Sequence, residues 1–225
     1  MNYLGHFVFN HRVCGLQPEP YFSMGVVLPD LWLRFSRKRR IRWKAVQAMK
    51  PQDAVGTHLR RGLLNHVDVD RRFHSLPSFL RWQRELKNTV KTTGVHPALV
   101  EFATHAGIEL TLDHILLRED PVLSEALYDL VSQSDARVVA DRVGQIGAVD
   151  TTGLDEVIQG FFARRFLRHY RTRRGLADVL QLILSLAKIT PPPVRILDEL
   201  FAIAVEIVHP PIIWAELQDH DTSPA

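Results

Sequence analysis

The chain has 225 residues, of which 46% are hydrophobic and 24% are charged, and its formal net charge is +3. This length and composition indicate a globular protein that buries one substantial core, and one domain is the simplest expectation. The single cysteine, Cys14, excludes an intramolecular disulfide and a multi-cysteine zinc site. A bound metal would therefore need His, Asp and Glu ligands.

The sequence contains no run of about 18 or more apolar residues, and its N-terminal segment lacks the basic head and long apolar core of a signal peptide. We therefore expect a cytoplasmic protein without a transmembrane segment. Positive charge is concentrated in residues 34–44 and 164–174. These clusters fit an acidic protein partner, an anionic membrane surface or a plainly solvated face. Nucleic acid is a weaker candidate because no recognised binding motif surrounds them.

Helical spacing of apolar residues dominates from about residue 56 onward, whereas strand signals are as short as Gly25-Val26-Val27-Leu28. The predicted fold class is therefore all α. The predicted helices are, in chain order, 78–94, 96–106, 109–118, 121–133, 154–167, 176–186 and 194–208, with a break at Gly107 and a frayed tail from Gln218 to Ala225. The triple proline at 191–193 cannot continue a helix, so it separates a body at 1–190 from a helical extension at 191–225.

The first chemical motif lies between Gly62 and Pro77, where His66, Asp70 and His74 recur at every fourth position. On an α-helix this spacing places the three side chains on one face. Such a stripe can hold a divalent ion. The alternative interpretation is a solvated, salt-bridged helix face.

A second group of metal-ligand residue types follows inside an apolar helical pattern. Glu109 and Asp113 are four residues apart, and His114 adjoins the second carboxylate. Two such helices favour metal binding over two unrelated solvated faces. These donors suit a hard or borderline ion such as Mn²⁺, Mg²⁺, Fe²⁺ or Zn²⁺.

Four sequence blocks occur in a characteristic order. They are Met1-Asn2-Tyr3-Leu4-Gly5-His6, Gly25-Val26-Val27-Leu28-Pro29-Asp30, Gly62-x3-His66-x3-Asp70-x3-His74-x2-Pro77, and Asp113-His114. Together they resemble the bacterial acyl carrier protein phosphodiesterase family, over roughly residues 1 to 180. The resemblance implies an all-α, single-domain helical bundle related to HD-type metal phosphohydrolases. It also implies a hydrolase that uses a divalent ion to release phosphopantetheine from holo acyl carrier protein.

The family blocks and the ligand-type residues together indicate a candidate site with one or two ions. We expect Mn²⁺ or Mg²⁺, with Fe²⁺ or Zn²⁺ as further choices, and an acidic carrier protein as partner. Asp70 and Asp113 are the expected catalytic residues. The expected metal ligands are His6, Asp30, His66, Asp70, His74, Glu109, Asp113 and His114, with His58 a lesser candidate. The expected phosphate-binding residues are Arg60, Arg61, Arg71 and Arg72.

Some of these residues also have purely structural interpretations. His6 could be a buried histidine bonded to a backbone carbonyl, Asp30 could cap the N-terminus of a helix, and Asp113 could pair with a base such as Arg118. These alternatives are open at the level of sequence.

The chain also departs from the family's pattern, and the departures concern the substrate more than the metal. Val67 replaces an arginine, Val26 an asparagine, His74 an aspartate and Leu76 a histidine. A histidine can replace an aspartate as a metal ligand, but a valine cannot replace an arginine as a phosphate donor. Two alternatives therefore stand beside the phosphodiesterase. One is a catalytically silent helical binding protein on the same scaffold, and the other is a metal phosphohydrolase acting on another phosphoester.

Overall fold

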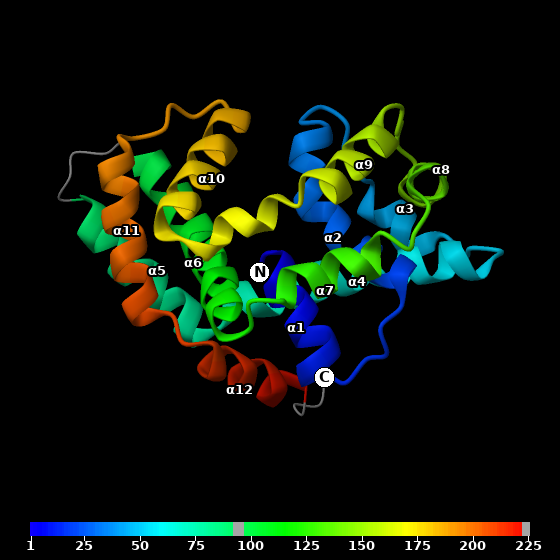
Figure 1. Cartoon of the computed structure of the whole chain (residues 1–225). Helices are drawn as coiled ribbons and strands as arrows, with labels where there is room; N and C mark the ends of the chain where they lie inside the picture. The colour runs from blue at the N-terminus through cyan, green and yellow to red at the C-terminus, as the bar shows by residue number, and fades with distance from the viewer. Residues whose placement is uncertain (92–96, 222–225) are drawn as a thin grey trace. The chain divides into compact units, whose positions relative to one another are not determined.

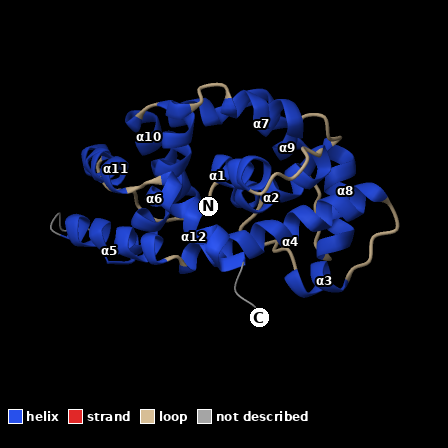
Figure 2. Cartoon of the chain, turned by 90° about the horizontal axis from the view of Figure 1, so that it is seen from below, coloured by secondary structure: helices blue, strands red, loops and turns tan. Residues whose placement is uncertain are grey.

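The computed structural model describes residues 1–91 and 97–221. Every regular element in these ranges is a helix, and no strand occurs among them (Figure 2), which confirms the all-α prediction. The predicted helix end at Gly94 and the last four residues of the predicted tail lie outside the described residues. None of the helices in these two ranges is both long and apolar enough to cross a membrane.

The helical elements of Figure 1 follow one another with short connections. They are α1 (Tyr3–Val8), the π-helix η1 (Phe9–Val13), α2 (Pro20–Phe35), α3 (Trp43–Ala48), α4 (Ala54–Ser75), α5 (Pro77–Lys91), α6 (Pro97–Glu119), α7 (Leu123–Val131), α8 (Ala136–Gly147), α9 (Leu154–Arg164), the 3-10 helix η2 (Phe166–Arg171), α10 (Arg173–Leu186), α11 (Val194–Ile207) and α12 (Pro210–Asp221).

The chain forms two compact units, each built from segments that are distant in sequence. The first unit comprises Met1–Gly5, Asp70–Leu123 and Leu167–Ala225, and the second comprises His6–Val69 and Ser124–Phe166. The four boundaries fall inside α1, α4, α7 and η2, and each of these is one continuous element. The domain division expected at residue 190 stays a prediction.

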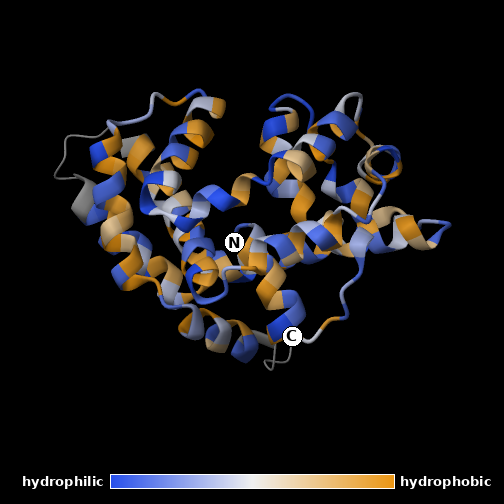
Figure 3. Cartoon of the chain, in the orientation of Figure 1, coloured by the Kyte–Doolittle hydropathy of each residue, from blue (hydrophilic) through white to orange (hydrophobic). Residues whose placement is uncertain are grey.

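The first unit is a helical bundle in which α6 packs against α5, α10 and α11 (Figure 1). α11 also packs against α5 and α10, and α12 packs against α5 and α6. Hydrophobic and hydrophilic residues alternate in bands along α5 and α11 (Figure 3), as expected of helices that bury one face. Helix α12 continues through residues 218–221, a segment that was expected to be frayed.

The predicted break at Gly107 is wrong, because α6 runs without interruption from Pro97 to Glu119. A Cβ atom on Gly107 would lie 2.8 Å from Leu200 Cδ2 of α11. Glycine at this position therefore allows α11 to approach α6 closely. It does not end a helix.

In the second unit α2 packs against α9, α3 against α8, and α8 against α9. The short β-branched run at Val26-Val27 lies buried in α2. That helix begins with Pro20 in its first turn, and the Glu19 carboxylate accepts hydrogen bonds from the backbone N–H groups of Tyr21 and Phe22. These are typical start signals of a helix, and burial of the valines outweighs their weak helical preference.

A pair of glycines brings α2 and α4 into close contact. A Cβ atom on Gly62 would lie 2.1 Å from the backbone oxygen of Phe22, and one on Gly25 would lie 2.4 Å from the backbone oxygen of Leu59. No other residue fits either position without separating the helices. Residues that follow these glycines on both helices are therefore held close to one another.

Helix α1 continues directly into the π-helix η1. The backbone N–H of Cys14 donates to Phe9 O at 2.8 Å and closes the π-helical segment. The Asn10 side chain, which is buried, donates to Asn65 Oδ1 of α4 at 2.9 Å. This amide pair ties the segment after α1 to α4.

Candidate metal centre

Among the described residues, the structure gathers possible metal ligands in two separate groups of three. One contains His6, His66 and Asp70, and the other contains His74, His105 and Glu109. Within each group the ligand atoms lie within 4.8 Å of one another. The predicted stripe on α4 is therefore divided, since His66 and Asp70 belong to one group and His74 to the other.

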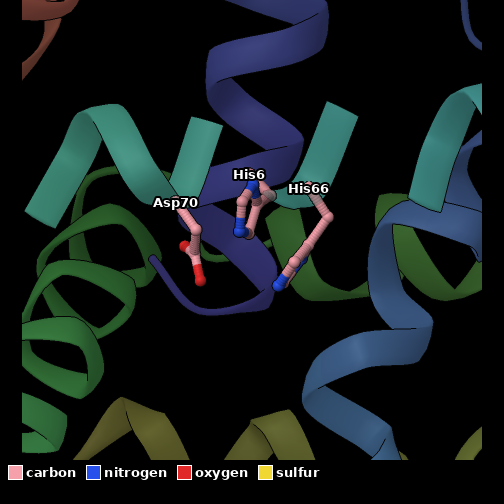
Figure 4. A group of neighbouring side chains, drawn as sticks. All are labelled: His6, His66 and Asp70. Atoms are coloured by element: carbon pink, nitrogen blue, oxygen red, sulfur yellow. The ribbon is translucent and has the colours of Figure 1, made fainter. Parts of the chain in front are cut away.

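In the first group the imidazole rings of His6 and His66 are stacked, with ring centroids 4.3 Å apart and an interplanar angle of 28°. The two residues are only 1% and 4% exposed. Asp70 follows His66 by one turn of the same continuous helix α4, and its side chain is 23% exposed. Figure 4 shows the three side chains extending to the same side of α4. The group thus offers two buried imidazole rings beside a carboxylate that is partly exposed.

The orientation of the His66 ring is set by a backbone group of α2. His66 Nδ1 lies 2.9 Å from Val26 O. Because a carbonyl oxygen can only accept, Nδ1 carries the proton, and in the neutral ring Nε2 therefore carries the lone pair. Metal-bound histidines characteristically donate their second ring N–H in this way. His66 is therefore held in the tautomer and orientation that a metal ligand requires.

The glycine pair explains why this contact forms. Val26 follows Gly25 on α2, and His66 lies one turn after Gly62 on α4. One turn further along α2, Asp30 Oδ1 lies 3.9 Å from His66 Nε2. Asp30 is an interior residue of α2, so the alternative that it caps a helix N-terminus does not apply. Its carboxylate faces Nε2, the ring nitrogen that is not used in the contact with Val26 O.

The second group lies entirely in the first unit. His74 Nε2 is 2.8 Å from Glu109 Oε1, and His105 Nε2 is 3.4 Å from the same oxygen. The ring centroids of His74 and His105 are 4.4 Å apart. The side chains are 30%, 38% and 19% exposed for His74, His105 and Glu109. The two histidines are therefore partly exposed, while Glu109 lies deeper.

Sequence reasoning did not identify His105, although a signal for it exists. His105, Glu109 and Asp113 follow one another at every fourth position, which repeats on α6 the spacing of His66, Asp70 and His74 on α4. Extending the α6 pattern by one turn toward the N-terminus would have included this histidine. The predicted break at Gly107 separated it from Glu109.

The Glu109 carboxylate remains ionised in this setting. Burial by itself would raise its pKa, but the Met1 amino group and hydrogen bonds from His105 and His74 lower the pKa well below the ordinary value. The Met1 amino group contacts Asp70 and lies 3.2 Å from Glu109 Oε1. Both carboxylates therefore already attract a cationic group.

Two predicted ligands, Asp113 and His114, bind backbone groups. The fully buried Asp113 carboxylate accepts hydrogen bonds from Leu4 N at 3.2 Å and Gly5 N at 2.8 Å, at the start of α1. Burial raises the pKa of Asp113 to about 7 despite these two donors. His114 Nδ1 lies 2.6 Å from Tyr170 O, and burial lowers the pKa of His114. Neither residue belongs to one of the two ligand groups.

The four predicted phosphate-binding arginines lie in different surroundings. Arg60 donates to Val46 O and Gln47 O at 2.7 Å each, and thereby holds the C-terminal end of α3 against α4. Arg61 lies over the Phe22 ring at 6.0 Å. The other two directly follow Asp70 on α4, where Arg71 is exposed and Arg72 is half-buried.

Other residues singled out in the sequence also make local contacts. His58 Nδ1 lies 2.8 Å from a carboxylate oxygen of Glu19, outside both ligand groups. In the first basic cluster Arg39 forms an ion pair with Asp150 at 3.2 Å. In the second, Arg165 pairs with Glu125 and with Asp129. Part of the charge in both clusters therefore stabilises the second unit internally.

The donors of the first group fit a divalent transition metal. Two imidazole nitrogens and one carboxylate are typical ligands of Mn²⁺, Fe²⁺ and Zn²⁺, whereas Mg²⁺ prefers oxygen ligands and bound water. The contact of His66 Nδ1 with Val26 O fixes the ring in the way that is usual for metal-bound histidines. Of the two ions that the sequence favours, Mn²⁺ fits the donors of this group better than Mg²⁺ does.

No model of a known protein family matches this sequence, and no curated protein or solved structure matches it either. The functional interpretation therefore depends on the side chains of the candidate centre.

Proposed function

We propose that this protein is a divalent-metal-dependent phosphodiester hydrolase that resembles acyl carrier protein phosphodiesterases, with an HD-type arrangement of its metal ligands. His6, His66 and Asp70 would hold the ion. The proposal depends chiefly on one observation, the hydrogen bond between His66 Nδ1 and Val26 O, because it fixes a buried imidazole with its lone pair at Nε2.

When bound, a divalent ion makes water more acidic and polarises a phosphoryl oxygen. The protein supplies the remaining requirements. Val26 O keeps the proton on His66 Nδ1, and the stacked His6 ring restricts how His66 can turn. The Asp30 carboxylate, 3.9 Å from His66 Nε2, is placed to act as a further ligand or to accept a proton from the attacking water.

Phosphate binding would fall to Arg71 and Arg72, which directly follow Asp70 on α4. Arg60 is the weakest of the four predicted candidates because two backbone carbonyls already engage its guanidinium. An acidic carrier protein would meet the exposed basic residues of the first cluster, among them Arg37, Lys38 and Arg40. Electrostatic attraction between the basic cluster and an acidic carrier protein is screened by salt, so association should slow as ionic strength rises.

The first test is the thermal unfolding midpoint with and without Mn²⁺. A ligand that binds only the folded state raises its stability by about 2.7 kcal/mol at a hundred times its Kd. We expect the midpoint to rise in the natural sequence and to remain unchanged in Asp70→Asn. Asp68→Asn is the matched control, because Asp68 lies on the same helix but off the stripe.

Hydrolysis is tested next with Mn²⁺ and holo acyl carrier protein, by following the release of phosphopantetheine by mass spectrometry. The proposal predicts release by the natural sequence and loss of release in Asp70→Asn. A Mn²⁺-dependent rise in midpoint without release would reject this substrate and leave either a hydrolase of another phosphoester or a catalytically silent binding protein. No rise and no release would reject the hydrolase.

The second candidate is a catalytically silent helical binding protein. It is favoured by Val67, which is exposed where the family has an arginine, and by the engagement of Arg60 with α3. Such a protein would still bind acyl carrier protein in a salt-dependent manner. Binding without any hydrolysis at saturating Mn²⁺ would identify this case.

A further inference from the structure

We propose that His74, His105 and Glu109 form a second metal site, separate from the centre proposed above and suited to Zn²⁺. The three residues lie within the first unit and belong to two helices, α4 and α6. This proposal does not depend on hydrolase activity.

The geometry of the group is that of preassembled ligands. Glu109 Oε1 lies 2.8 Å from His74 Nε2 and 3.4 Å from His105 Nε2, so the three ligand atoms already face one another. His105 and Glu109 are one turn apart on α6, which keeps their spacing fixed. An ion would therefore require only small changes of side-chain angles to replace these direct contacts.

The aromatic ring of Phe79 packs against both imidazoles and restricts their movement. The Phe79 ring centroid is 5.1 Å from that of His74 and 5.2 Å from that of His105, and Phe79 itself is buried. Phe73 packs against Phe79 at 4.9 Å. Such an apolar shell restricts ring rotation and strengthens electrostatic contacts at the ligand atoms.

The donor set and its exposure indicate the class of metal. Two imidazole nitrogens and one carboxylate favour Zn²⁺, Co²⁺ or Ni²⁺ over Mg²⁺ and Ca²⁺, which prefer oxygen ligands. Both histidine side chains are about one-third exposed, at 30% and 38%, so the group lies near the surface of the protein. Zinc sites with three protein ligands commonly retain an exchangeable water.

One neighbouring group competes with the ion. The Met1 amino group lies 3.2 Å from Glu109 Oε1, the oxygen that also faces both histidines. Binding of Zn²⁺ would weaken this contact. The contact also shows that the carboxylate accepts a cation at this position.

The test is Zn²⁺ binding by the full chain carrying Asp70→Asn, which removes a ligand of the other group. Isothermal titration should show one Zn²⁺ bound per chain. His105→Gln in this background should weaken that binding by about tenfold or more, because even the loss of a group that only hydrogen-bonds to a metal ligand has an effect of this size. His209→Gln, which changes an exposed histidine of the first unit, is the matched control and should bind as before.

A second measurement requires no variant of the group. Nitrogen-15 spectra of the histidine rings in the Asp70→Asn protein should show Zn²⁺-dependent shifts at the Nε2 atoms of His74 and His105. Unchanged shifts at both rings, or unchanged Zn²⁺ affinity in a folded His105→Gln protein, would overturn the second site. The Mn²⁺ response of the natural sequence would be unaffected by either result, so the two proposals can fail independently.

Discussion

The two ligand groups contain the same donors, two histidines and one carboxylate, in opposite surroundings. In the first group His6 and His66 are almost completely buried, and a backbone carbonyl fixes the tautomer of His66. In the second group the histidines are accessible, and their contacts are with a carboxylate that also binds an amino group. Backbone contacts and burial therefore determine which imidazole lone pair is available, and the choice of donor residues alone does not.

The largest expected effect comes from Gly62→Ala, which breaks the first group and leaves the second. The new Cβ would lie 2.1 Å from Phe22 O, so α2 and α4 must separate and the His66 to Val26 hydrogen bond is lost. We expect a destabilisation of at least about 4 kcal/mol, measured by urea unfolding. Gly160→Ala is the control, because nothing lies within 4 Å of its Cβ position. A similar loss in both variants would contradict the close helix contact.

The next effect is a pH dependence from Asp113, one turn beyond Glu109 on α6. Its pKa is about 7 in the folded protein, so the folded state holds a proton that the unfolded chain releases near pH 4. The free energy of unfolding should therefore fall as pH rises from about 4 to 7, and this group should account for about 3 to 4 kcal/mol of the decrease. Above pH 7 its contribution should stay constant. Urea unfolding of the metal-free protein across this range tests it. Asp113→Asn should remove this part of the pH dependence, and an unaltered slope would be the contrary result.

A smaller effect is expected from His66→Ala. This variant tests whether the buried first group contributes more to stability than the partly exposed second group does. The substitution removes the His66 Nδ1 donor that contacts Val26 O and removes the stacked partner of His6. The lost buried hydrogen bond and the lost packing together should cost about 2 kcal/mol in metal-free buffer. Chemical unfolding in the presence of a chelator measures it. A cost below that of His105→Ala would reverse the proposed difference between the groups.

The smallest effect is expected from His105→Ala. This side chain is partly exposed, and its contact with Glu109 is at 3.4 Å. Pairs of this kind contribute little in water, so the free energy of unfolding should change by at most about 1 kcal/mol without metal. With Zn²⁺ present the natural sequence should gain stability that this variant lacks. Differential scanning calorimetry with and without Zn²⁺ separates the cost of the lost side-chain contacts from the loss of stabilisation by bound Zn²⁺.

The sequence predicted the ligand stripe of α4 because periodicity within one helix is a local property. His66, Asp70 and His74 do share the spacing that places them along one face. Their division between two groups was not predictable, because it depends on which distant residue each one meets. His6 lies 60 positions before its stacking partner His66. His74 is 35 positions from Glu109.

The wrong or incomplete predictions share the same physical origin. Gly107 has the conformational freedom that often ends helices, but its neighbour Leu200 on α11 makes it a packing position. Asp113 has the chemistry of a ligand, yet it binds the backbone of Leu4 and Gly5, more than a hundred positions away. Such long-range partners cannot be read from one sequence. The class of fold could be predicted because it depends on local apolar spacing.

The π-helical segment after α1 ends at Cys14, which is exposed and is the chain's single cysteine. One thiol reagent would therefore attach a nitroxide at a unique position, in the same unit as His6 and His66. Mn²⁺ is paramagnetic and shortens the relaxation of a nearby nitroxide, whereas Zn²⁺ is diamagnetic and does not. The natural sequence is thus already suited to magnetic resonance that distinguishes the two ions without further mutation.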